Sequence, residues 1–400
     1  MDADLILVGG GLANSLIALA VAARDPSRRI LMVDAGAPAG GHTWSFHEPD
    51  MNEGQRRWIA PAVACAWRGQ EVHFTKFSRR LRTGYASLTS QSLAGAVAAC
   101  PSVTRIQARA DRISAECIET DGNRTLRAPC VVDGTGRVPE AYMALGWQVF
   151  VGIELECEAP HNRAIPIIMD ARVPQHGGYR FVYTLPFTDR RILIEDTRYT
   201  DGAVLDDADC AAAVGAYAAA RGWSGAEVRR ERGVLPVAMA FDAPAFWAAA
   251  AGGAVPVGMR AGLFHPVSGY SLPLAARVAE VVAAHPGDTE IVFAAVRRFA
   301  LAEARRQSYL RFLSRLLLRA AAPEERRKIM EHFYRLPDAL VERFYAGRLT
   351  LADQARILIG KPPVPIANAL ACLRERPLLH DARRKRGYDG PAVLAEEQAL

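Results

Sequence analysis

Lysine is scarce in this sequence, and paired cysteines and metal-ligand patterns are missing. Only four of its 49 basic residues are lysines, and we attribute the excess of arginine to genome composition. Its seven cysteines are widely spaced, odd in number and never form a CxxC pair. This spacing indicates neither a disulfide framework nor a zinc cage and is typical of reduced cytosolic thiols. Because no cluster of carboxylates and histidines has metal-ligand spacing, we expect no metal.

Long hydrophobic runs are also missing. Residues 5–23 are uncharged and long enough to cross a bilayer, but three glycines interrupt them and aspartates precede them. A signal peptide needs basic residues at that place. The serine-hydrolase motif GxSxG is absent. We therefore expect a chain that is made in the cytosol and does not span a membrane.

The overall composition is that of a folded globular protein. Half of the 400 residues are hydrophobic and 23% are charged, which excludes a disordered or fibrous chain and suits two to three domains. The formal net charge is +6, and most of the excess lies in residues 301–400. No nucleic-acid-binding motif accompanies this basic end, so we expect no nucleic-acid partner, whereas anionic lipid head groups remain possible.

The first 34 residues carry the pattern of a βαβ dinucleotide-binding unit. An apolar run at 5–8 leads into Gly9, Gly10 and Gly11; residues 12–23 have helical spacing, and a second apolar run ends in Asp34. The glycines, with Leu12 and Ala13, would bring backbone N–H groups to a pyrophosphate at the helix N-terminus. Asp34 would accept hydrogen bonds from a ribose. Asn14 stands where a third glycine is usual and predicts a slightly wider helix–strand approach.

Further glycine-containing segments favour FAD over a nicotinamide as the bound dinucleotide. The loop at 39–46 contains Gly41 and Trp44, and a later apolar strand runs into a second turn with Asp133, Gly134 and Gly136. A third segment contains Gly262, His265, Pro266 and Gly269. Glycine turns so dispersed suit an FAD domain that a substrate domain interrupts. His265 either contacts the flavin or stabilises its own turn.

Several longer motifs resemble the bacterial lycopene β-cyclase family. Apart from the first glycine turn with Asn14, which many flavoproteins share, they are particular to that family. They are residues 42–46 (HTWSF), 166–170 (PIIMD), 178–183 (GYRFVY), 193–197 (LIEDT), 262–266 (GLFHP), 269–273 (GYSLP), 344–347 (FYAG) and 360–365 (GKPPVP).

This resemblance implies a fold, a reaction and a catalytic acid. The fold is an α/β, FAD-binding Rossmann-like domain interrupted by a β-sheet substrate domain, with a helical C-terminal region. The implied reaction cyclises the linear ψ-ends of lycopene, through γ-carotene, to the β-rings of β-carotene. It uses reduced FAD and NAD(P)H as electron source, although substrate and product are isomers. Glu195 matches the essential acid of the family. Acceptance of other acyclic carotenoids and the oligomeric state stay open.

The expected domains are discontinuous. We assign residues 1–75, 100–145 and 235–290 to FAD binding, and residues 76–99 and 146–234 to the substrate. Residues 291–400 form the helical region with a possible membrane-facing surface. We place the protein in the cytoplasm, attached peripherally to the inner membrane.

The residues around Glu195 support an acid role independently of the resemblance. Cyclising a polyene without oxidation requires a proton donor, and an apolar pocket raises a carboxyl pKa enough to provide one. Glu195 follows an apolar strand, and Asp196 would point to the other sheet face. The alternative is that both acids end the strand in a solvated turn. Glu154 likewise lies either on a solvated sheet face or in the pocket. Aromatic candidates for the pocket are Trp44, Phe46, Tyr179, Phe181, Tyr183 and Tyr270.

A water-insoluble C40 substrate also requires a membrane-facing surface. In residues 305–320, Arg311, Arg315 and Arg319 recur every four positions beside a leucine stripe. This pattern is typical of a basic amphipathic helix on a head-group interface, or of an ordinary core helix with a solvated arginine face.

Two other functions remain open at this stage. One is a flavin monooxygenase or prenyl-chain reductase of the same superfold. The other is a non-catalytic prenyl-lipid binding protein, which the intact glycine turn, Asp34 and Glu195 disfavour.

Overall fold

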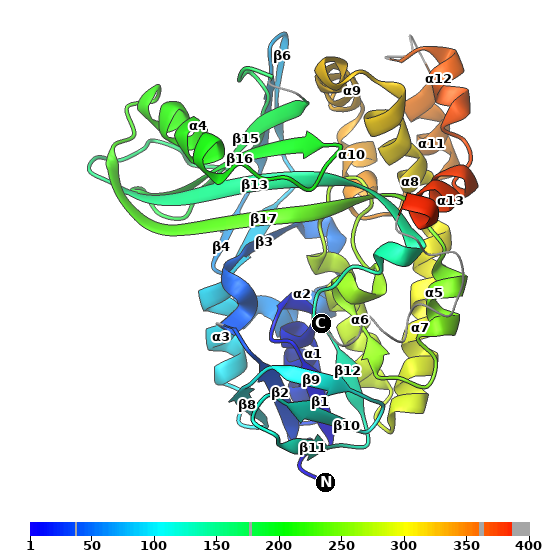
Figure 1. The fold of residues 1–400 in the computed structure, drawn as a ribbon. Coiled ribbons are helices and arrows are strands. Elements are labelled where there is room, and N and C mark those ends of the chain that lie inside the picture. The colour runs from blue at the N-terminus through cyan, green and yellow to red at the C-terminus, as the bar shows by residue number, and fades with distance from the viewer. Residues whose placement is uncertain (37, 176–177, 360–363, 386–400) are drawn as a thin grey trace.

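A computed structural model describes residues 1–36, 38–175, 178–359 and 364–385. Two large sheets form its upper and lower halves, and most of its helices lie along one side (Figure 1). The first four residues of the motif at 360–365 lie outside the described residues. In the described part of the chain, no helix combines the length and hydropathy needed to cross a membrane.

The lower sheet is parallel and contains the predicted βαβ unit. The helix expected at 12–23 is α1 (Leu12–Arg24), and it connects β1 (Leu5–Val8) to β2 (Ile30–Asp34). Strand β1 is buried throughout, as expected where helices or other strands cover both sheet faces. The strand order is β18-β12-β1-β2-β8, in which the added strands are β8 (Val103–Gln107), β12 (Val131–Asp133) and β18 (Val255–Pro256).

The upper sheet has seven strands and two different faces. Helix α4 (Asp207–Ala219) covers its outer face, and the inner face is turned toward the lower half (Figure 1). The order runs β17 (Gly225–Phe241), β13 (Met143–Cys157), β16 (Arg191–Thr200), β15 (Tyr179–Pro186), β14 (Ile167–Asp170), β5 (Gln70–Phe74) and β6 (Phe77–Leu81).

The other strands of the described residues form two small antiparallel sheets. One is β11-β10-β9, at Thr125–Arg127, Cys117–Thr120 and Ala110–Ile113. The other is β3-β7-β4, at Thr43–His47, Tyr85–Thr89 and Cys65–Trp67.

The remaining helices confirm the expected helical C-terminal region. Helix α6 packs along α1 through an almost wholly buried apolar face. The helices are α2 (Glu53–Ile59), α3 (Ser90–Ala98), α5 (Ala243–Ala249), α6 (Leu272–Ala284), α7 (Thr289–Arg306), α8 (Ser308–Arg315), a π-helical turn (Leu316–Ala320), α9 (Arg326–Phe333), α10 (Asp338–Tyr345), α11 (Leu351–Leu358), α12 (Ile366–Ala371) and α13 (Arg376–Lys385).

The expected boundary between residues 75 and 76 does not coincide with the sheets. Strand β5 belongs to the upper sheet because it pairs with β14 on one side and β6 on the other. Helix α3, expected in the substrate domain, packs instead against α1 of the nucleotide-binding half. Strand β5 and helix α3 are short and lie where the chain passes between the two halves. The elements they pack against are far away in sequence, so a short stretch of sequence does not predict them.

The arginine stripe expected at a membrane is mostly internal. The Arg311 and Arg315 side chains are buried, and Arg319 alone of the three is exposed. Arg311 binds the Glu375 carboxylate at 2.9 Å, and Arg315 donates to the carbonyl oxygen of Cys372 at 2.6 Å. The membrane-facing interpretation of this stripe is therefore wrong. The periodicity of the sequence does not show whether the polar face of a helix contacts water or other parts of the protein.

Candidate active site

A cavity of about 330 Å³ separates the glycine turns from the inner face of the upper sheet. From the nucleotide side it is lined by Gly11, Leu12, Ala13, Gly134, Gly136, Val257 and Gly258. From the upper sheet it is lined by Gln148, Phe150, Ile168, Met169, Phe181, Tyr183, Glu195, Tyr199 and Leu235. The two regions that the sequence associates with a dinucleotide and with acid chemistry thus meet at one cavity.

The N-terminus of α1 has the form of a phosphate cradle. Its N-cap, Gly11, makes no side-chain cap, and the first helical turn carries no acidic residue. A Cβ at Gly11 would meet nothing within 4 Å, so the approach to the first helical amides is open. Gly9 adopts a φ of 91°, and a Cβ there would lie 2.7 Å from the Gly134 carbonyl oxygen. The donor set and the positive end of the helix dipole fit a pyrophosphate.

Asn14 joins the first glycine turn to the strand before it. Its side-chain amide donates to the carbonyl oxygens of Val8 and Gly9, both at 2.8 Å. A Cβ on Gly134 would lie 2.5 Å from the Asn14 amide nitrogen, so the second turn must approach as glycine. The residue that departs from the glycine pattern therefore holds the first two glycine turns together.

The residues predicted to bind the cofactor fall into two groups, those that line this cavity and those that lie outside its lining. Seven line it: Gly11, Leu12, Ala13, Trp44, Gly134, Gly136 and Gly269. The others lie outside its lining: Gly9, Gly10, Asp34, Gly41, Asp133, Gly262, His265 and Pro266.

Both predicted aspartates fix glycine turns. The Asp34 carboxylate accepts from the backbone N–H groups of Gly10 and Gly36. Asp133 accepts from the backbone N–H of Thr135 at 3.0 Å and from the Arg260 guanidinium at 3.1 Å. Asp34 thus ends β2 directly against the glycine turn, which is the place expected of a ribose acceptor.

His265 uses both ring nitrogens within the protein. Its Nε2 donates to the Phe344 carbonyl oxygen at 2.9 Å, and its Nδ1 accepts from the backbone N–H groups of Val267 and Ser268. Burial lowers the pKa of His265 to about 4, so the ring is neutral at pH 7. These contacts give it the turn-stabilising role, and a contact with flavin stays a prediction.

Glu195 lies in the middle of β16, not at the end of a strand. Its side chain lines the cavity, whereas Asp196 is fully buried on the α4 side, where it pairs with Arg180 at 2.5 Å. This confirms that the two neighbouring acids point to opposite faces. Since the strand continues to Thr200, a solvated turn at Glu195 is excluded.

The surroundings of Glu195 favour its protonated form. Burial and then the negative charge of Glu231 raise the pKa of Glu195 to about 8, while a hydrogen bond from Thr197 at 2.6 Å opposes the rise. A carboxyl group of this kind keeps its proton at pH 7 and can serve as a general acid.

A chain of hydroxyl groups begins at Tyr183, the neighbour of Glu195 on the adjacent strand. Tyr183 is the register partner of Glu195 on β15, and its hydroxyl contacts those of Ser45 at 2.9 Å and Tyr85 at 3.0 Å. Tyr85 continues to the Tyr270 hydroxyl at 2.7 Å. Burial raises the pKa of each of these tyrosines well above its usual value, so all three are neutral.

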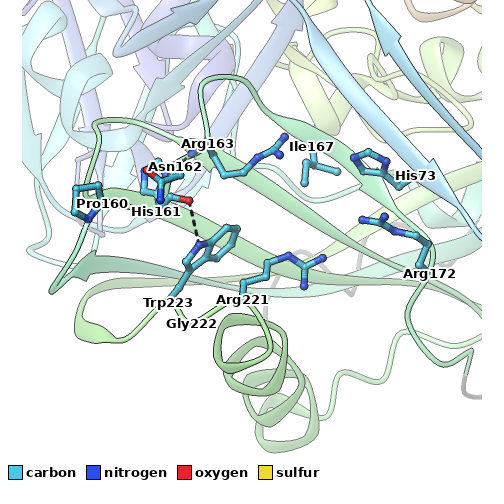
Figure 2. A pocket seen from close by; sticks show the side chains of 10 residues that line it. All are labelled: His73, Pro160, His161, Asn162, Arg163, Ile167, Arg172, Arg221, Gly222 and Trp223. Atoms are coloured by element: carbon cyan, nitrogen blue, oxygen red, sulfur yellow. Dashed lines mark hydrogen bonds between the residues drawn. The ribbon is translucent and has the colours of Figure 1, made fainter.

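A second cavity, of about 530 Å³, lies elsewhere along the upper sheet (Figure 2). Arg163, Arg172 and Arg221 surround it, but each binds a carboxylate. Arg163 pairs with Glu71, and the other two share Asp170, the strand-end acid of the PIIMD motif. This cavity contains no acid comparable to Glu195.

The whole pattern matches one known family. Its model, described as lycopene cyclase protein, matches residues 4–371. The chain belongs to the lycopene cyclase family.

Individual relatives of this lycopene cyclase family member agree. A lycopene beta-cyclase from Paracoccus sp. strain N81106 is 50% identical over 95% of this chain and 100% of its own. A lycopene beta-cyclase from Pseudescherichia vulneris is 46% identical over 92% of this chain and 96% of its own.

Solved structures with a similar fold include a flavin-dependent halogenase and a reductase-like protein. A flavin-dependent halogenase from Xanthomonas campestris has a TM-score of 0.56 at 12% identity, covering 97% of this chain and 96% of its own. A geranylgeranyl bacteriochlorophyll reductase-like protein from Thermoplasma acidophilum has a TM-score of 0.52 at 12% identity, covering 96% and 98%. At such identities these likenesses show the fold alone, and they agree with the FAD-binding class expected from the glycine turns.

Sequence reasoning found part of the cavity wall. Of the six aromatic candidates, Trp44, Phe181, Tyr183 and Tyr270 line the cavity, whereas Phe46 and Tyr179 are buried in the cores outside its lining. It missed Phe150, Tyr199 and Tyr345, and it missed the charged residues behind Glu195. Glu154, for which the sequence left a solvated face or the pocket open, is on neither: it is buried outside the cavity lining and paired with Arg191 and Arg229. Alternation along β13 places it on the inner face, but only tertiary packing shows that this face is covered.

Proposed function

We propose that this family member is a lycopene β-cyclase that converts the ψ-ends of lycopene, through γ-carotene, to the β-rings of β-carotene. The observation that carries the proposal is Glu195, a carboxyl group held protonated on an otherwise largely apolar cavity. The relatives named lycopene beta-cyclase support the choice of substrate.

The proposed chemistry needs a proton but no net oxidation. Glu195 donates its proton to the terminal double bond of a ψ-end, which leaves a tertiary cation. The next double bond along the chain, C5=C6 when the cation is on C1, attacks the cation through C6, which closes the six-membered ring and leaves the cation on C5. A proton then leaves C6 and the C5=C6 double bond forms again, so product and substrate are isomers. Phe150, Phe181 and Trp44 exclude water from the cation and offer π-faces to it.

The dinucleotide in this proposal is FAD, with NAD(P)H as its electron source. The first amides of α1 at Gly11, Leu12 and Ala13 would hold the pyrophosphate, and Asp34 would hold the ribose. When bound and reduced, FAD would supply negative charge that stabilises the carbocation.

A hydrocarbon substrate must come from a membrane, and α11 and α12 offer the surface for it. We define the α11–α12 surface by its exposed apolar side chains, which are Leu351, Leu358, Ile359, Ile366, Leu370 and Leu373. Arg356, Arg374 and Arg376, which are also exposed, belong to the same segments of the chain, a combination that suits anionic lipid head groups. Helix α10, whose Tyr345 lines the cavity, is tied to α11 by the Arg343–Asp353 ion pair at 2.6 Å. In this proposal the protein binds the inner membrane from the cytoplasm.

The pigments of a lycopene-accumulating bacterium test the proposal. A host carrying this chain is expected to make β-carotene, and one carrying Glu195→Gln is expected to retain lycopene. Saturated products or oxygen uptake with stoichiometric NAD(P)H consumption would instead identify a reductase or monooxygenase. A colourless, flavin-free protein that binds lycopene without converting it would identify a lipid-binding protein.

A further inference from the structure

Four side-chain positions form one row across the upper sheet at Glu195. Tyr183 on β15 pairs with Glu195 on β16, Glu195 pairs with Gly152 on β13, and Gly152 pairs with Glu231 on β17. Side chains of one such row point to the same sheet face. The two glutamates therefore share a face, and only a glycine separates them.

Gly152 leaves the space between the two acids to the Glu231 side chain. A Cβ on Gly152 would lie 3.0 Å from Cγ and 3.3 Å from Oε1 of Glu231. The Glu231 side chain thus lies over Gly152, on the way to Glu195. A methyl group at position 152 would also lie 3.2 Å from Cδ1 of Leu193, so Glu231 and Leu193 would have to give way by a few tenths of an ångström.

Glu231 is fixed there as a carboxylate. It is only 5% exposed, and it accepts from the Arg229 guanidinium at 2.6 Å and from the Thr43 hydroxyl at 2.9 Å. Arg229 also binds Glu154 at 3.0 Å, so one guanidinium serves two buried acids. Arg191 also pairs with Glu154, at 2.6 Å, so Arg229 divides its charge between Glu231 and an acid that has a second cation.

Other groups around Glu195 modify the field of Glu231 without replacing it. Thr197 donates to Glu195, while Asp196 lies behind the sheet and Tyr183 and Tyr270 are neutral neighbours. His42, in the loop before β3, interacts with both Glu231 and Arg229, and burial lowers its pKa, so it is neutral. Glu231 acts on the pKa of Glu195 more strongly than Arg229 does.

We propose that Glu231 is a positioning residue for the proton donor: its carboxylate, fixed over Gly152 by Arg229 and Thr43, keeps Glu195 in its acid form. This role rests on the proposed function, in which Glu195 donates the proton. The same negative charge makes ionised Glu195 a stronger base, which favours its reprotonation after each ring closes.

The pH dependence of kcat for lycopene, with flavin-loaded protein, tests this role. Glu231→Gln should move the alkaline limb to lower pH by about one unit, because removing a nearby negative charge lowers the pKa of an acid. Glu231→Asp keeps the charge and should restore most of the wild-type limb. Glu227→Gln, an exposed change on the same strand, is the matched control and should leave the profile unchanged.

Gly152→Ala provides a second test should Glu231→Gln fail to fold or to bind flavin. The added methyl group shifts Glu231 by a few tenths of an ångström, so the alkaline limb should move to lower pH by less than in Glu231→Gln, while the KM for lycopene changes little. Superimposable profiles for wild type and a folded Glu231→Gln or Gly152→Ala would overturn the role of Glu231. A wild-type protein that makes no β-carotene would overturn the proposed function itself.

Discussion

Glu195 illustrates the conflict between stability and acid catalysis within one residue. The sequence indicates an acid after an apolar strand, and the structure places it on a cavity with a second carboxylate in the same sheet row. Water would stabilise the charged form of Glu195, so burial beside Glu231 has the opposite effect. The predicted consequences concern both rate and stability.

The cyclisation rate should fall as the pH rises through about 8. The donor is the protonated form of Glu195, and the pKa of Glu195 is raised to about 8. Lycopene turnover by flavin-loaded protein, measured from pH 6 to pH 10, checks this prediction. A flat rate across that range contradicts it.

Replacing Glu195 with glutamine should stabilise the folded protein at alkaline pH. The pKa of Glu195 is higher folded than unfolded, so between pH of about 4.5 and 8 the folded state holds a proton that the unfolded state loses. The contribution of Glu195 to the free energy of unfolding therefore decreases as pH rises through that window. The glutamine side chain of the variant would not ionise and would retain the hydrogen bond with Thr197. Calorimetry at pH 6 and pH 9 should show the Tm of the variant gaining on that of wild type at pH 9; an unchanged difference contradicts this.

At the scale of elements, buried arginines join α8 to its neighbours. Arg315 donates to carbonyl oxygens of Met239 on β17 and of Cys372 and Leu373 after α12. Arg315→Ala leaves these acceptors, and the nearby Glu375, short of a donor in the interior. We expect it to lower the free energy of unfolding by about 3 kcal/mol.

The exposed Arg319→Ala change is the control for Arg315→Ala. It should alter stability by less than about 0.5 kcal/mol. Equal effects of the two substitutions in urea unfolding would contradict the internal role of Arg315.

Helices α11 and α12 should govern membrane binding. Leu358→Asp combined with Ile366→Asp is expected to weaken binding to phosphatidylglycerol vesicles at least about tenfold, because two apolar side chains leave the acyl boundary. Val204→Asp changes a still more exposed apolar residue outside this surface and should have no effect. Cosedimentation measures both, and equal binding by all three proteins would exclude this surface.

Over the whole molecule, local patterns predicted local structure and failed where partners come from far away. The βαβ unit, its glycine turns and the strand that carries Glu195 follow from short segments with strong periodicity. Glu231 lies 36 positions after Glu195, and only the register through β13 brings the two together. The burial of Arg311 and Arg315 depends likewise on β17 and on the segment after α12. The polar residues of a helix therefore do not by themselves show whether that face is exposed to water or buried in the protein.

The central claim is that Glu195, between the two halves of this fold, is the acid that cyclises lycopene. The most direct test compares purified wild type and Glu195→Gln, loaded with equal amounts of reduced flavin, on lycopene in vesicles. We expect β-carotene from wild type and a rate lower by at least about a hundredfold from the variant, at unchanged flavin content. Ring formation by Glu195→Gln at close to the wild-type rate would contradict the account.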